Sequence, residues 1–151
     1  MLDSDLLSPA RILAEVRVGS KKRLLELISV TLAKNNKNLS SREIFESLYA
    51  REHLGSTAIG NGVAIPHGRV SGSDGVEALF LRLNKPLPFD ADDGKPIDLL
   101  FALAVPINCT EDHSKLLSNI SERFSDEELL EQIRHAADAG EIWSLLSSSY
   151  A

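Results

Sequence analysis

Residues 99–105 (LLFALAV) decide the fold, because every position in this stretch is apolar. A strand with one face in solvent alternates apolar and polar residues, whereas a strand that is apolar on both faces is covered on both sides. The stretch therefore predicts a strand in the middle of a β-sheet that lies under helices. We expect an α/β chain built around it.

The segments on either side of this strand predict the remaining elements. Further strands are expected at residues 12–18 and 76–83, and the central strand at residues 97–105. Helices are expected where a short polar side chain precedes an amphipathic or acid-led segment. The residues predicted to begin the five helices are Ser20, Ser40, Thr110, Ser125 and Asp138, and the first helix is expected to run to about Lys34. Residues 92–94 (DDG) predict a hairpin turn before the central strand.

Length and composition restrict the class of protein. The 151 residues suit one domain with its own core. A net charge of −6 and an aromatic content of 5% argue against nucleic acid as a partner. The single cysteine, Cys109, forms no internal disulfide and suits a reducing compartment. Because no apolar run approaches a membrane span and the N-terminus lacks a signal-peptide pattern, we expect no membrane insertion and a cytoplasmic location.

Residues 60–69 (GNGVAIPHGR) hold the most informative histidine of the chain. Pro66 fixes its own φ and pushes the residue before it toward an extended conformation. Gly62 and Gly68 allow other backbone or a ligand to come close. The imidazole of His67 is thus held on a stiff support that a bulky group can still reach. We interpret His67 as a functional side chain.

The other three histidines give weaker signals. His53 and His135 lie near predicted helix ends, where the structural interpretation is favoured. His113 lies in the first turn of the third helix, just beyond the central strand, where sites form in α/β sheets. Taken alone, His113 also favours a structural interpretation. A thiol nucleophile formed by Cys109 and His113 is less favoured than an incidental thiol.

Residues 51–57 (REHLGST) suit the binding of a phosphoryl group together with the histidines. The planar guanidinium of Arg51 matches phosphate oxygens, and Ser56, Thr57 and nearby amides offer further donors. The alternative for Arg51 is an ordinary surface cation at a helix end. The spacings typical of a nucleotide phosphate loop or of zinc ligands are missing from the sequence.

Residues 52–68 resemble the phosphorylation-site signature of the mannitol/fructose-type enzyme IIA proteins of the bacterial phosphoenolpyruvate-dependent phosphotransferase system. The matching positions are Glu52, Ile59, Gly60, Val63, Ala64, Ile65, Pro66, His67 and Gly68. The likeness extends over nearly the whole chain. Within the family it is greatest to the nitrogen-regulatory branch, because of the GNG sequence at residues 60–62 and the LLFAL sequence at residues 99–103.

This resemblance implies a fold and a role. The fold is a mixed β-sheet flanked by helices on both sides, a single EIIA type-2 domain over residues 1–151. On this resemblance, His67 is expected to accept a phosphoryl group on its distal nitrogen from an HPr-like carrier, while His113 and Arg51 are expected to hold the phosphoryl oxygens. Neither a metal ion nor a bound cofactor is expected, since the donor is a phosphorylated protein. The phosphorylation state then regulates target proteins of the nitrogen phosphotransferase system.

Two alternative functions remain open in the sequence. One is a sugar-specific IIA component that passes the phosphoryl group to a separate IIB in fructose or mannitol uptake. The other is a binding module that kept the fold and lost the transfer. The presence of His67, Arg51 and His113 disfavours the second alternative.

Overall fold

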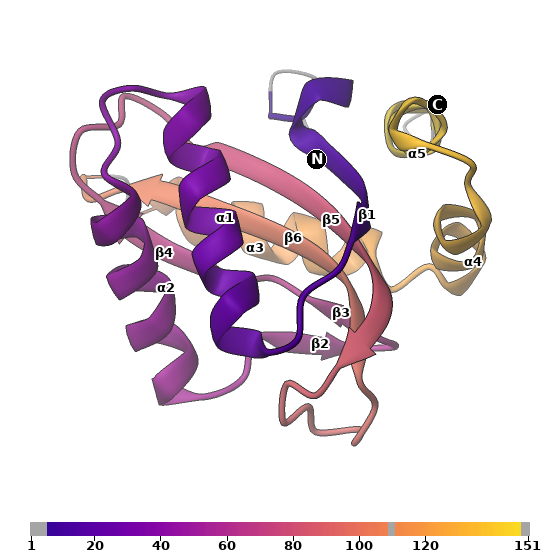
Figure 1. Ribbon diagram of the computed structural model, residues 1–151. Helices are drawn as coiled ribbons and strands as arrows, with labels where there is room; N and C mark the ends of the chain where they lie inside the picture. Colours follow the sequence, from indigo (N-terminus) through magenta and orange to yellow (C-terminus); the bar gives the residue numbers. More distant parts are fainter. Residues whose placement is uncertain (1–5, 109–110, 149–151) are drawn as a thin grey trace.

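The computed structural model describes residues 6–108 and 111–148, and of residues 111–113 and 148 it describes the backbone alone. In chain order the described elements are a 3-10 turn η1 (Pro9–Arg11), β1 (Ile12–Val16), α1 (Lys21–Asn35), α2 (Ser41–Leu54), β2 (Ala58–Gly60), β3 (Val63–Ala64), β4 (His67–Val70), β5 (Glu77–Leu87), β6 (Ile97–Pro106), α3 (Glu111–Arg123), α4 (Glu127–His135) and α5 (Ala139–Ser148). Figure 1 shows α1 and α2 on one side of a sheet and α3 on the other.

Strand β6 is the centre of a six-stranded mixed sheet, as the apolar stretch at residues 99–105 predicts. The strand order is β1-β5-β6-β3-β2, and β4 also pairs with β6. Strands β3 and β4 run parallel to β6, whereas β5 runs antiparallel to it. Both β3 and β4 therefore lie along the same edge of β6, one after the other. The mixed sheet flanked by helices on both sides is confirmed.

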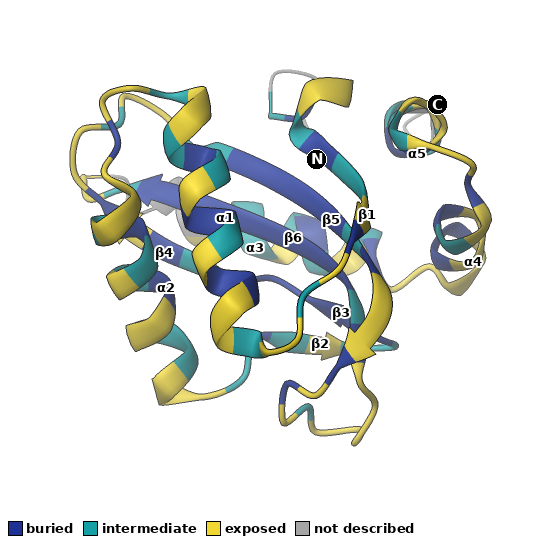
Figure 2. Cartoon of the chain, viewed as in Figure 1, coloured by how far each residue is buried: buried dark blue, intermediate teal, exposed yellow. Residues whose placement is uncertain are grey.

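Alternate residues of β6 contribute to two different hydrophobic layers, because successive side chains of a strand point to opposite faces. All seven residues at 99–105 have a relative exposure of 0%. Leu99, Phe101, Leu103 and Val105 pack in the layer that contains α3, α4 and α5. Leu100, Ala102 and Ala104 pack in the layer that contains α1 and α2. Figure 2 shows the buried strands between the partly exposed helices.

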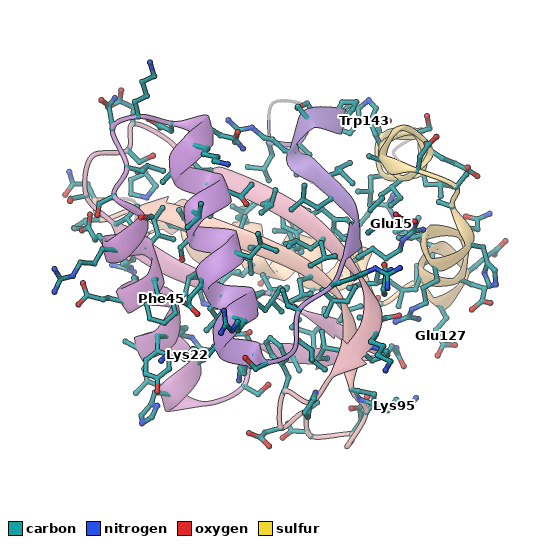
Figure 3. The ribbon with its side chains drawn as sticks, viewed as in Figure 1. Glu15, Lys22, Phe45, Lys95, Glu127 and Trp143 are labelled. Carbon is teal, nitrogen blue, oxygen red and sulfur yellow. The ribbon has the colours of Figure 1, made fainter. Side chains whose placement is uncertain are left out.

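Charged side chains lie mainly at the outside of the molecule. Glu15, Lys22, Lys95 and Glu127 are exposed, and Figure 3 shows Lys95 and Glu127 toward the lower right edge of the fold. None of the described helices combines the length and the apolar content that crossing a bilayer requires.

Three of the predicted helix starts are confirmed in atomic detail, and one is wrong by a residue. The hydroxyl oxygens of Ser20 and Ser40 each accept a backbone N–H from the first turn of the helix that follows, at 3.2 Å. The third is Asp138, whose carboxylate accepts the Glu141 N–H at 2.9 Å in the first turn of α5. Helix α4 begins after Asp126 rather than after Ser125. The Asp126 carboxylate accepts two N–H groups, at 3.1 and 3.3 Å, whereas the Ser125 hydroxyl donates to the Glu122 carbonyl at the end of α3. A carboxylate that binds two amides is the better cap.

Other predicted boundaries differ from the structure or lie outside its described part. Strand β1 ends at Val16, and β5 continues past residue 83 to Leu87. The turn predicted at residues 92–94 is present, since the Gly94 N–H donates to the Ala91 carbonyl at 3.0 Å, but residues 88–96 form a longer connection than a tight hairpin. Thr110 and Cys109 lie outside the described residues.

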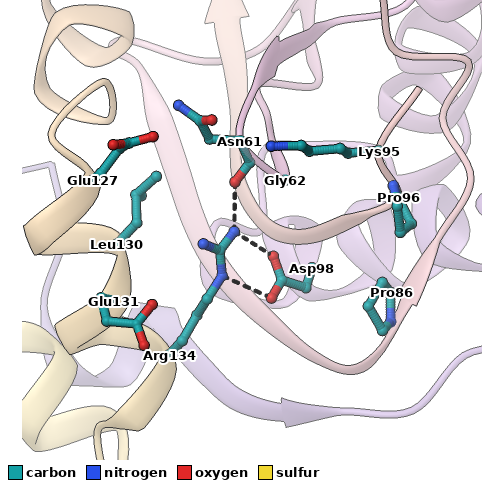
Figure 4. Close-up of a pocket in the computed structure, with 10 residues that line it drawn as sticks. All are labelled: Asn61, Gly62, Pro86, Lys95, Pro96, Asp98, Glu127, Leu130, Glu131 and Arg134. Carbon is teal, nitrogen blue, oxygen red and sulfur yellow. Dashed lines mark hydrogen bonds and ion pairs between the residues drawn. The ribbon is translucent and has the colours of Figure 1, made fainter. Parts of the chain in front are cut away.

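The Gly-Asn-Gly segment packs under α4, as Figure 4 shows. The guanidinium of Arg134 donates to both Asp98 carboxylate oxygens, at 2.8 and 2.9 Å, and to the Asn61 carbonyl at 2.6 Å. Gly62 has a φ of +82°, and a Cβ there would lie 2.5 Å from the Arg134 side chain. Position 62 therefore requires glycine, and the segment that leads into β3 is fixed against the opposite helical layer.

Candidate functional site

His67 begins β4 immediately after a proline that interrupts the line of strands along β6. His67 pairs with Leu103 of β6, and the Pro66 carbonyl accepts the Leu103 N–H at 2.9 Å. Proline has no N–H to give to a strand, so it fits this break between β3 and β4. Within residues 6–108 and 111–148, β4 pairs with β6 alone. The imidazole is thus held at the edge of the sheet by a rigid segment.

A hydrogen bond fixes the tautomer of His67. The Nδ1 atom lies 2.7 Å from the Ile65 carbonyl oxygen. A carbonyl only accepts hydrogen bonds, so Nδ1 carries the hydrogen, and the lone pair of the neutral ring is on Nε2. The family resemblance implies the distal nitrogen as the attacking atom, and that nitrogen is Nε2, which carries the lone pair in this tautomer.

The surroundings of His67 favour its neutral form. Burial lowers the pKa of His67 from its ordinary value of 6.5, and the Arg51 guanidinium lowers it further. The hydrogen bond to Ile65 and the Glu52 carboxylate oppose this shift, but burial dominates and the pKa stays lowered. A lowered pKa means that the ring keeps its nucleophilic lone pair down to a lower pH.

A surface hollow brings His67 together with cationic side chains. Ser47, Ala50, Arg51 and Leu54 of α2 line it on one side, and His67, Gly68 and Arg69 of β4 line it on the other. Arg51 is held by a hydrogen bond of 2.9 Å from its guanidinium to the Gly55 carbonyl. The predicted pair of Arg51 and His67 is therefore brought to one place.

Arg69 is a further cation of the hollow that the sequence does not predict. It lines the same hollow as His67 and is exposed. The signal was available, because residues two apart on a strand project on the same side. Residues 67–70 carry no local strand pattern, so this signal can be read only once β4 is assigned from the structure.

Gly68 lets α2 lie directly on β4. A Cβ at this position would lie 2.4 Å from the Ser47 hydroxyl oxygen and 3.1 Å from the Leu48 backbone nitrogen. The Ser47 hydroxyl also donates to the Arg69 carbonyl at 2.9 Å. The close approach predicted for Gly68 is confirmed, and the approaching group is the helix that carries Arg51.

The structure does not bring Ser56 and Thr57 into the hollow. Thr57 is 6% exposed and donates both its N–H and its hydroxyl hydrogen to the Glu52 carboxylate. The Ser56 hydroxyl oxygen accepts the Ala58 N–H at 3.2 Å. Phosphate binding by Ser56 and Thr57 stays a prediction, and these bonds give it no support. His113 belongs to α3, but its side chain lies outside the described part of the chain.

A histidine of fixed tautomer therefore lies beside two arginines at the edge of the sheet, and this arrangement suits the binding of an anionic group. The chain belongs to the family described as "Phosphoenolpyruvate-dependent sugar phosphotransferase system, EIIA 2", whose model matches residues 5–149. It is 43% identical over 141 residues to a nitrogen regulatory protein of Pseudomonas aeruginosa, a match that covers 93% of this chain and 92% of that protein.

Solved structures agree with this assignment. The crystal structure of the nitrogen regulatory protein IIA-Ntr from Neisseria meningitidis matches with a TM-score of 0.87 and 41% identity, and the match covers 94% of this chain and 97% of that one. IIA mannitol from Escherichia coli matches with a TM-score of 0.78 at 20% identity, covering 93% and 98% of the two chains, which shows the fold alone. The family that the sequence resembles is confirmed, and the relatives named here at 41–43% identity are nitrogen regulatory proteins.

Proposed function

We propose that the Nε2 atom of His67 accepts a phosphoryl group from a phosphohistidine on an HPr-like carrier of the nitrogen phosphotransferase system. The observation that carries this proposal is the hydrogen bond from Nδ1 to the Ile65 carbonyl, which leaves the lone pair on Nε2. The phosphorylation state of His67 then controls target proteins, because phosphorylation adds about two negative charges to this surface.

The transfer is a direct exchange between two histidines. The bond from phosphorus to the carrier's imidazole nitrogen breaks, and that nitrogen keeps the electron pair, while Nε2 of His67 forms the new bond. Charge spreads over the peripheral phosphoryl oxygens in the transition state, so positioning and cationic donors supply most of the catalysis. Arg51 and Arg69, which line the hollow, are the donors that we propose from the geometry. His113 is proposed as a further donor on the resemblance alone.

Reconstitution of the relay tests this function directly. The protein is incubated with phosphoenolpyruvate, the first enzyme of the system and the HPr-like carrier, and its intact mass is measured under neutral conditions. We expect one added phosphoryl group that is labile in acid and stable in base. No added mass, or a label on another side chain, would falsify the proposal.

The second candidate function is transfer onward to a IIB component of a sugar system. The family description, which names the sugar phosphotransferase system, is the observation that favours it. The nitrogen regulatory relatives at 41–43% identity favour regulation instead. Adding purified mannitol- and fructose-type IIB domains to the phosphorylated protein separates the two, since loss of the label to either would establish onward transfer.

Replacing Arg51 by lysine is expected to slow phosphoryl acceptance by about tenfold or more, because lysine keeps the charge but loses the planar, bidentate donor. The measurement is the initial rate of mass gain at a limiting concentration of carrier. Arg42→Lys is the matched control, since Arg42 is also on α2 but is exposed and pairs with Glu46 at 3.6 Å. Equal rates of phosphoryl acceptance in Arg51→Lys and Arg42→Lys would show that Arg51 has only a structural role.

The pH dependence of acceptance follows from the lowered pKa of His67. Protonation occupies the Nε2 lone pair, so acceptance falls as the pH decreases through this pKa, and the midpoint is expected below 6.5. Histidine NMR titration gives the same midpoint, with the signal assigned by comparison with His67→Gln. Arg51→Gln is expected to raise the midpoint, because it removes a cation that disfavours protonation. A midpoint of 6.5 or higher in the native protein would contradict this prediction.

A further inference from the structure

A buried carboxylate lies at the end of α2, beside the hollow, and the proposed transfer step does not use it. The Glu52 side chain is 5% exposed. Its charge is balanced by the Lys21 ammonium at 2.9 Å, which also lies 4.4 Å from the centre of the buried Phe89 ring. A buried charge costs free energy unless it is paired and hydrogen-bonded. The hydrogen bonds of the Glu52 carboxylate therefore indicate its role.

Glu52 holds the loop that follows its own helix. One carboxylate oxygen accepts the Thr57 N–H at 3.3 Å, and the other accepts the Thr57 hydroxyl hydrogen. These two bonds fix the backbone of residue 57 against the last turn of α2. The direction of the Thr57 carbonyl is thereby set.

The Thr57 carbonyl in turn holds the segment that orients the histidine. It accepts the Ile65 N–H at 3.0 Å, and the Ile65 carbonyl accepts the Nδ1 hydrogen of His67 at 2.7 Å. The Ile65 peptide is also next to Pro66, whose ring limits the backbone. A continuous series of hydrogen bonds therefore joins the Glu52 carboxylate to the imidazole.

We propose that Glu52 is a positioning residue for His67, which acts through Thr57 and Ile65 to keep the hydrogen on Nδ1 and the lone pair on Nε2. This inference rests on the proposed function for its consequence in transfer. Its structural part, the control of the tautomer and of the ring orientation, concerns the unphosphorylated protein and is testable alone.

The experiment compares Glu52→Leu with Glu52→Gln by two readouts. The first is imidazole 15N NMR of the unphosphorylated protein, which reports the tautomer of His67 and the protection of its Nδ1 hydrogen. The second is the initial rate of phosphoryl acceptance. In Glu52→Leu we expect a mixture of tautomers, a faster exchange of the Nδ1 hydrogen and acceptance slowed by about tenfold or more. Glu52→Gln is expected to restore most of both, because its amide can still accept from the Thr57 N–H and donate to the hydroxyl.

Glu43→Leu is the matched control for a general effect on α2. Glu43 lies in the first turn of the same helix, and its carboxylate likewise accepts the N–H and hydroxyl hydrogens of a residue beyond the helix, Ser71, at 2.9–3.1 Å. Removing this carboxylate is expected to leave the Nδ1 signal of His67 and the rate of acceptance unchanged.

Two results would overturn the inference. One is an unchanged His67 tautomer and Nδ1 exchange in folded Glu52→Leu. The other is an unchanged Nδ1 signal in Thr57→Val, which is the deciding variant if Glu52→Leu fails to fold. Thr57→Val removes only the hydroxyl bond and keeps nearly the same side-chain volume. A native protein that accepts no phosphoryl group would instead reject the proposed function, because the NMR readout is obtained without the relay.

Discussion

His67→Gln is expected to remain folded and to accept no phosphoryl group at all. Glutamine can still donate from its side-chain amide to the Ile65 carbonyl oxygen, which lies 2.7 Å from Nδ1 of the native ring. The amide nitrogen has no available lone pair, so it cannot form the bond to phosphorus. The change in the free energy of unfolding is expected to stay within about 1 kcal/mol, because one hydrogen bond is exchanged for another.

The measurement is the intact mass after incubation with the complete relay, together with a thermal melt of each variant. His53→Gln and His135→Gln are the controls, because both histidines are exposed and neither lines the hollow. Both are expected to gain the phosphoryl group as the native protein does. A phosphoryl group on His67→Gln would show that another side chain is the acceptor.

Gly68→Ala is expected to lower the free energy of unfolding by about 2–3 kcal/mol and to slow phosphoryl acceptance. The added Cβ would lie 2.4 Å from the Ser47 hydroxyl oxygen and 3.1 Å from the Leu48 backbone nitrogen, so α2 must move away from β4. This movement separates Arg51 from His67, which lie on these two elements. Chemical denaturation and the rate of mass gain measure the two effects.

Two further variants check that the cause is the contact with α2. Gly75→Ala adds the same methyl group where nothing lies within 4 Å of the new Cβ, so it is expected to change stability little. The double variant Ser47→Gly with Gly68→Ala removes the clashing side chain and is expected to recover part of the lost stability. A Gly68→Ala protein as stable as the native one would show that α2 does not depend on this close approach.

The central part of the fold is predictable from sequence because it rests on local pattern. The unbroken apolar run at residues 99–105 fixes the middle strand, and the caps at Ser20 and Ser40 fix two helix starts. The short strands β3 and β4 cannot be predicted in this way, because residues 63–64 and 67–70 become strands only by pairing with β6 far along the chain. Tertiary pairing there supplies what local preference does not.

Some residues of the candidate site can likewise be predicted from the sequence, and others cannot. His67 and Arg51 are predictable, because their residue types and neighbours carry the signal. Glu52 is marked by the signature, but its contacts, like the place of Arg69 in the hollow, are visible only in the structure. The place of Arg69 depends on the strand assignment of residues 67–70, and the role of Glu52 depends on hydrogen bonds to Thr57 that no spacing in the sequence reveals.

The alternation along β6 has a practical consequence for protein engineering. Leu100, Ala102 and Ala104 support the layer that contains α2, and hence the helix that carries Arg51. Phe101 and Leu103 support the opposite layer, with α3, α4 and α5. Repacking around Phe101 is therefore expected to leave the helix that carries Arg51 in place, whereas larger residues at 102 and 104 would displace it.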